Sequence, residues 1–138
     1  MLSSSRHYHR CMRSHIEKFF ERYGAALSSD DVHGIASCFD PPTVVIDDAT
    51  TSLMIDRAQL EAHFTGMAER YRARGAFTAV ATVRGVEQLA SALWLADVQW
   101  DSLDATGAPA LVNAETYRYL LRAIQPDEPL IVAAVVTG

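Results

Sequence analysis

The chain has 138 residues, of which 49% are hydrophobic and 21% are charged, and its formal net charge at pH 7 is −5. This length suits one domain with its own core, and the composition excludes a disordered chain, a collagen-like chain and a disulfide scaffold. The negative charge disfavours nucleic acid and anionic membranes as partners, because both carry negative charge themselves.

The first residues differ in character from the rest. Residues 1–13 are polar and rich in serine, arginine and histidine, without a periodic apolar pattern, so they predict a flexible N-terminal tail, followed by a single domain over residues 14–138. No apolar leader precedes the domain, and the run from Leu130 to Val136 is far shorter than the ~20 residues that cross a bilayer. We therefore expect a cytoplasmic protein without a membrane segment. Cys11 and Cys38 predict free thiols, and we expect no metal site.

Helical spacing of apolar side chains predicts three helices in the first half of the chain, over residues 14–27, 32–39 and 57–74. Asp30 or Asp31 can cap the second helix and Asp56 the third, since aspartate accepts hydrogen bonds from the free N–H groups of a first turn. Pro41 and Pro42 follow the second helix and are expected to end it.

The remaining segments predict strands. A short β-branched strand over residues 43–47 can pair back with residues 53–55, and four longer strands follow Gly75, over residues 77–87, 89–101, 110–123 and 130–137. In the third long strand, Glu115, Tyr117 and Tyr119 share one face with Leu111 and Asn113. This order predicts an α+β domain in which helices cover one face of a strongly curved sheet.

Residues 22–47 read RYGAALSSDDVHGIASCFDPPTVVID. A helix with a Tyr before a small-small-Leu stretch, an acid-capped second helix ending in Phe, and a strand ending in Asp follow one another here. The segment resembles the opening of the nuclear transport factor 2-like superfamily, which includes ketosteroid isomerases, scytalone dehydratases and SnoaL-like cyclases; ketosteroid isomerase is the closest. The resemblance extends over residues 14–137. It implies a cystatin-like, cone-shaped, curved antiparallel sheet covered by three N-terminal helices.

The resemblance also implies three catalytic positions. Tyr23 falls where the isomerase has the tyrosine that donates to the developing oxyanion, and Asp47 falls where it has the carboxylate that moves the proton. Glu115 falls near the second acid, which in the isomerase is a protonated aspartate. The isomerase has an Asp-Pro step at the base, whereas here Asp47 is followed by Asp48. Pocket aromatics of the family map onto His63 and Trp94.

Each of these residues also has a purely structural interpretation. Tyr23 can be a core tyrosine, and Asp47 can cap a turn in solvent. Glu115 can pair with Arg118 or Arg84 across the sheet, because an isolated inward carboxylate is costly. His63 can bond to backbone at the edge of the core, and the tryptophans can be packing residues.

The resemblance implies a small-molecule-binding domain, with Tyr117, Tyr119 and Asn113 beside His63 and Trp94 in its pocket. Whether it is an enzyme stays open; if so, it is a cofactor-independent isomerase, dehydratase or cyclase that moves protons on an apolar, carbonyl-bearing substrate. The alternative is a non-catalytic ligand-binding or dimerisation domain, which forms a homodimer through its sheet. Epoxide hydrolysis is a third option, but it needs an arginine relay that is hard to place among Arg84, Arg118 and Arg122.

Overall fold

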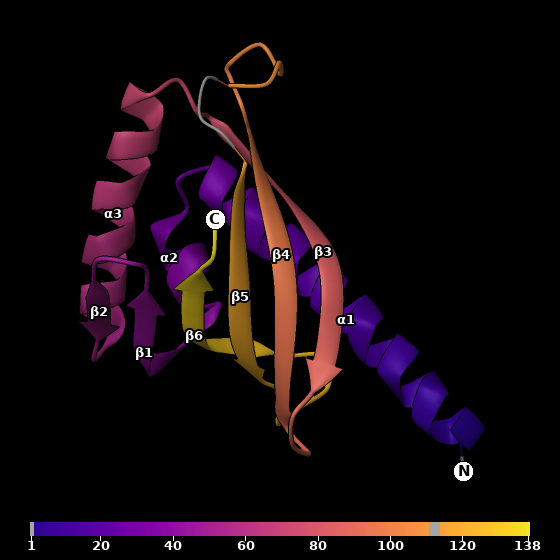
Figure 1. Cartoon of the computed structure of the whole chain (residues 1–138). Helices are drawn as coiled ribbons and strands as arrows, with labels where there is room; N and C mark the ends of the chain where they lie inside the picture. Colours follow the sequence, from indigo (N-terminus) through magenta and orange to yellow (C-terminus); the bar gives the residue numbers. More distant parts are fainter. Residues whose placement is uncertain (1, 111–113) are drawn as a thin grey trace.

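The structure is a computed structural model that describes residues 2–110 and 114–138, and side chains from residue 6 onward. Within these residues the chain forms three helices and one six-stranded sheet (Figure 1). The helices are α1 (Leu2–Ser28), α2 (Val32–Ala36) and α3 (Arg57–Ala73). The strands are β1 (Phe39–Ile46), β2 (Thr51–Met54), β3 (Thr78–Gln88), β4 (Leu93–Leu103), β5 (Glu115–Arg122) and β6 (Leu130–Val136). The α+β prediction, with helices against a curved sheet, is confirmed.

The strands follow the order β2-β1-β6-β5-β4-β3 in one curved, unclosed sheet. All neighbouring pairs are antiparallel except β1 and β6, which run parallel. The expectation of a wholly antiparallel sheet is therefore wrong at this pair. Alternating side chains show which face of a strand is buried but carry no information on the direction of its neighbour.

The alternation predicted for the long strands is present in β4. Trp94, Ala96, Val98 and Trp100 are buried on one face, while the residues between them are partly exposed. Register shifts in β3 between Val83 and Gly85, and in the pairing of β5 with β6, bend the sheet. The buried face of β4 packs against α1, where Phe20 and Tyr23 contact Trp100 with ring centroids 6.3 and 5.4 Å away.

The first residues are helical, where the sequence predicts a flexible tail. Helix α1 begins at Leu2, and Met12 is only 1% exposed. The Arg13 guanidinium donates to the Val83 carbonyl at 3.0 Å, and the His9 ring lies 3.2 Å from the Val86 carbonyl. These polar tips bond to the backbone of β3 while the helix packs on it. Residues 2–13 are therefore helical despite their polar composition, because tertiary contacts with β3 stabilise the helix.

Two strand starts also differ from the sequence expectation. Strand β1 begins at Phe39 and includes Pro41 and Pro42, whereas the strand was expected to begin at Thr43. A register shift between Phe39 and Val44 lets the prolines lie in the strand without donating ladder hydrogen bonds. Strand β5 begins at Glu115, and the predicted residues 111–113, Asn113 among them, lie outside the described residues.

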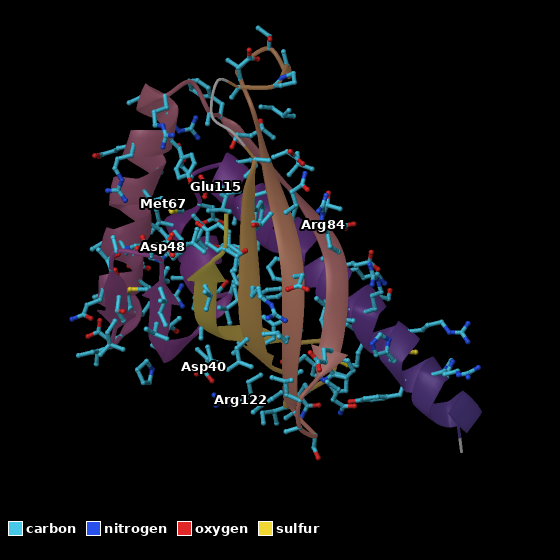
Figure 2. The ribbon with its side chains drawn as sticks, viewed as in Figure 1. Asp40, Asp48, Met67, Arg84, Glu115 and Arg122 are labelled. Atoms are coloured by element: carbon cyan, nitrogen blue, oxygen red, sulfur yellow. The ribbon has the colours of Figure 1, made fainter. Side chains whose placement is uncertain are left out.

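One cavity lies between α3 and the sheet. Met67 of α3 and Glu115 of β5, labelled in Figure 2, both line it. Arg122 and Asp40 lie at the other end of the sheet. No helix among the described residues is both long and apolar enough to span a membrane.

Candidate functional site

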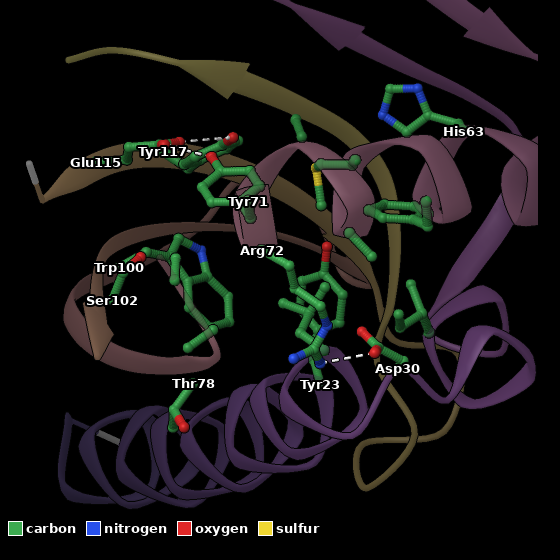
Figure 3. A pocket seen from close by; sticks show the side chains of 18 of the residues that line it. Tyr23, Asp30, His63, Tyr71, Arg72, Thr78, Trp100, Ser102, Glu115 and Tyr117 are labelled. Atoms are coloured by element: carbon green, nitrogen blue, oxygen red, sulfur yellow. Dashed lines mark hydrogen bonds and ion pairs between the residues drawn. The ribbon is translucent and has the colours of Figure 1, made fainter. Parts of the chain in front are cut away.

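A cavity of about 120 Å³ lies between α1, α3 and the concave face of the sheet (Figure 3). Aromatic rings form much of its wall, from Tyr23, Phe39, Phe64, Trp100, Tyr117 and Tyr119. An engineered apolar cavity of about 150 Å³ is large enough to bind benzene. The cavity of this chain is of the same order, so its size suits a molecule with about one ring.

A carboxylate with two tyrosines lies at one side of the cavity. The Tyr71 hydroxyl of α3 and the Tyr117 hydroxyl of β5 each donate to a different oxygen of Glu115, the second at 3.2 Å. Burial, reinforced by the neighbouring Glu115, raises the pKa of Tyr71 and Tyr117 far above the ordinary value. Both phenols therefore remain protonated and can keep donating. The expected partner Arg118 pairs instead with Asp97, at 2.8 Å.

Tyr23 projects from α1 into the centre of the cavity (Figure 3). It is 4% exposed, and its ring meets those of Phe39, Phe64 and Trp100 edge-on. Burial raises the pKa of Tyr23 well above its usual value, so the phenol stays neutral. Among the described residues its hydroxyl has no hydrogen-bond partner. Tyr23 therefore offers a free donor to a ligand oxygen.

Trp100 and Tyr119 form the wall beside Tyr23. The Trp100 indole N–H donates to the Tyr119 hydroxyl oxygen at 2.8 Å, and the Tyr119 ring stacks on Tyr117 with centroids 5.4 Å apart. His63 of α3 lines another part of the wall, and burial followed by the charge of Arg70 lowers its pKa. A neutral imidazole is therefore favoured at this position.

An ion pair forms a second polar side of the cavity. Arg72 of α3 donates from Nη2 to the Asp30 carboxylate at 2.7 Å, and its guanidinium lies over the Phe77 ring with the Cζ atom 5.0 Å from the centroid. The Arg72 Nε atom is buried and has no partner among the described residues. All three residues line the cavity.

The structure brings five of the predicted site residues to this cavity, namely Tyr23, His63, Glu115, Tyr117 and Tyr119. The sequence interpretation missed Tyr71, Arg72 and Asp30. Tyr71 lies on the apolar face of the predicted third helix. That position was the one sequence feature that could have indicated its place in the cavity. The partners of Tyr71 and Arg72 are 44 and 42 residues away in the chain, so only the fold reveals them.

Asp47 and Trp94 do not line the cavity. One Asp47 oxygen accepts from the Ala49 and Thr50 backbone N–H groups at 2.8 and 2.7 Å and from the Thr50 hydroxyl at 3.0 Å. It is exposed in the turn after β1 and is not among the lining residues. Trp94 is buried beneath α1, against the rings of Tyr8 and His9. The tryptophan that lines the cavity is Trp100, where the resemblance implies Trp94.

Asp47 gives a pH-dependent prediction. Its hydrogen bonds to Ala49 and Thr50 lower the pKa of the folded state, so the carboxylate adds stability above its unfolded pKa, and this contribution disappears as pH falls through the lowered folded pKa. We expect Asp47→Ala to lower the urea midpoint at neutral pH and to have less effect near pH ~2. Asp48→Ala, one position along the same turn, is the control. An Asp47→Ala deficit that grows at acid pH would contradict this assignment.

The fold and cavity define a class of protein, the α+β domains in which helices close a curved sheet around a small apolar pocket. Residues 13–137 match the family model described as NTF2-like protein (DUF6841). The chain belongs to this NTF2-like family. No curated protein matches the chain.

Several solved structures are similar to this chain. An NTF-2 like protein of unknown function from Shewanella oneidensis is 10% identical, with a TM-score of 0.69, over 91% of this chain and 98% of that one. A ketosteroid isomerase-like protein from Erwinia carotovora is 14% identical, with a TM-score of 0.62, over 89% and 92%. A putative calcium/calmodulin dependent protein kinase II association domain from Xanthomonas campestris is 17% identical, with a TM-score of 0.61, over 86% and 83%. At these identities the likeness shows the fold.

Proposed function

We propose that the chain binds a small apolar carbonyl compound in the cavity and transfers a proton on it without a cofactor. The observation that carries this proposal is a carboxylate, Glu115, held by two tyrosine hydroxyls at the wall of an apolar cavity. A proton-transfer site needs a base near the reacting carbon and a donor toward the oxygen where negative charge grows. Glu115 supplies the first and Tyr23 the second.

Local chemistry supports these two roles. Tyr71 and Tyr117 fix the orientation of the Glu115 carboxylate, which has lone pairs left for a substrate proton. Tyr23 stays neutral because it is buried, so it can donate a hydrogen bond to an enolate oxygen. We place the base at Glu115 and not at Asp47, the position implied by the family resemblance, because one Asp47 oxygen accepts hydrogen bonds within its own turn. The ketosteroid isomerase-like name of one structural neighbour supports the same reaction class.

Binding is tested with cyclohexanone, whose ring fits the cavity and whose carbonyl can accept from Tyr23. Titration followed by NMR or thermal shift should give saturable binding, since a ligand of the folded state raises the melting temperature. Tyr23→Phe should weaken binding roughly 3- to 10-fold, the value of one neutral hydrogen bond. Tyr8→Phe, a matched change on the exposed end of α1, should leave it unchanged. Equal affinity in all three proteins would refute the role of Tyr23.

The outer face of the sheet supports a second role, a homodimer. Leu95 and Leu120 pair across β4 and β5 beside the Asp97 and Arg118 ion pair, next to the exposed Val135. In a two-fold interface the same surface of both copies meets. The leucines of one copy would then pack against those of the other, and Asp97 of one copy could pair with Arg118 of the other. Sedimentation of the full chain at micromolar concentration tests this, and a monomer would contradict it.

A further inference from the structure

Two hydrogen-bond donors at the cavity, on Arg72 and Tyr23, have no partner among the described residues. The Nε–H of Arg72 is buried and unsatisfied, and the Tyr23 hydroxyl has no acceptor among the described residues. The two carboxylates of the cavity already accept hydrogen bonds, Glu115 from two tyrosines and Asp30 from Arg72. A buried donor without an acceptor costs free energy, so a ligand that supplies an acceptor to Arg72 Nε gains there, and the Tyr23 hydroxyl offers a second hydrogen bond. The cavity is therefore complementary to an acceptor-rich molecule.

The Arg72–Asp30 ion pair and the Glu115 cluster lie at different parts of the wall. Figure 3 shows Arg72 and Asp30 together on one side, with Tyr71, Glu115 and Tyr117 grouped on another. Apolar and aromatic side chains line the space between them. A ligand that reaches both sides would carry a polar group at each end of an apolar body.

Arg72 suits a carboxylate better than a neutral acceptor. Its planar guanidinium can donate two parallel N–H groups to one carboxylate. Among the described residues its charged partner is Asp30, and Nη2 also donates to the Ser28 carbonyl at 3.4 Å. Both side chains of the ion pair are partly exposed, at 31% for Arg72 and 44% for Asp30. Exposed ion pairs contribute little net stability, so Asp30 can be exchanged at small cost. Stacking over Phe77 keeps the guanidinium in place during this exchange.

We propose that the ligand is a small carboxylic acid that also carries the carbonyl group, and that its carboxylate binds Arg72 in exchange for Asp30. This inference rests on the proposed function, because it assigns the ligand class of the same cavity. The negative Glu115 disfavours the carboxylate at its own side, so the ligand enters in one orientation. The carboxylate lies at Arg72, the apolar body lies between the aromatic rings, and the carbonyl faces Tyr23 and Glu115.

Benzoate and benzamide test the charge, because they have nearly the same shape and differ in the anionic group. For the wild-type chain at neutral pH we expect benzoate to bind roughly 10- to 100-fold more tightly than benzamide, the range for hydrogen bonds to a charged group. Arg72→Met retains an unbranched apolar side chain over Phe77 and should abolish this preference while benzamide still binds. Circular dichroism and the melting temperature establish that the variant is folded.

Asp30→Asn is the second test, and here benzoate affinity is expected to rise. Asp30 has a φ of 55°, in the left-handed region, and asparagine adopts this region as readily as aspartate. The variant removes the competing carboxylate, so benzoate should bind several-fold more tightly than to the wild type while benzamide affinity stays the same. A mere packing role for Asp30 would not separate the two ligands in this way.

Arg122 and Asp40 are the matched controls. They form an ion pair of 3.1 Å with exposures of 44% and 40% at the far end of the sheet, away from the cavity (Figure 2). Arg122→Met and Asp40→Asn should change neither ligand's affinity. If cyclohexanone and benzamide bind but benzoate has no advantage, the anion inference is wrong while the proposed function stands. If none of the three ligands binds, both are wrong.

Discussion

Glu115→Gln is expected to lower the rate of α-proton exchange of cyclohexanone in D₂O by roughly 10²- to 10⁴-fold, the usual contribution of a positioned general base. Glutamine keeps a carbonyl oxygen that can accept from Tyr71 or Tyr117, so the local packing is retained, but the amide cannot take up the proton. The exchange is followed by the loss of the α-proton signal in NMR, with protein at catalytic concentration.

A matched control separates chemistry from binding. Glu87→Gln changes the same functional group on the exposed side of β3 and should leave exchange unchanged. Cyclohexanone affinity of Glu115→Gln should stay within a few-fold of the wild type, so the effect falls on the rate. If Glu115→Gln exchanges the ketone as fast as the wild type, Glu115 is not the base. If it binds no ketone at all, Glu115 has a binding role instead.

Phe20→Ala should have the largest effect on stability. Phe20 is fully buried in α1, and its ring centroid lies 4.9 Å from that of Tyr119 and 6.3 Å from those of Tyr23 and Trp100. Truncating a buried phenylalanine costs about 3–5 kcal/mol, because apolar contact is lost and a cavity remains. For a chain of this length we expect the melting temperature to fall by roughly 10–20 °C.

The control for this substitution is Ile124→Ala, at a side chain that is 72% exposed, where a change within about 0.5 kcal/mol is expected. Because Phe20 packs behind three residues of the cavity wall, Phe20→Ala should also weaken cyclohexanone binding at temperatures where the variant is folded. A fall of only a few degrees would mean that neighbouring side chains collapse into the vacated space.

The sequence by itself determined the order and type of the elements after residue 13, whereas residues 2–13 are helical and not a flexible tail. The apolar period of α1, the alternation around Trp94 and Trp100, and the acidic cap at Asp56 each reflect local chain geometry, which neighbouring residues encode. The placement of Glu115 on the same face as Tyr117 and Tyr119 follows from the two-residue period of a strand. These local rules placed Tyr23 on an inward helix face and the acid on an inward strand face.

Tertiary structure decided which of these residues meet. Asp47 directly follows strand β1, and its side chain accepts from backbone N–H groups of the turn; a strand pattern does not show where the residue after the strand points. Tyr71 and Arg72 are neighbours on α3 but bond to β5 and to the turn after α1. The polar start of α1 is ordered by contacts with β3 and β4. Contacts between residues distant in sequence depend on how the elements pack, and the local periodicity of the sequence does not determine that packing.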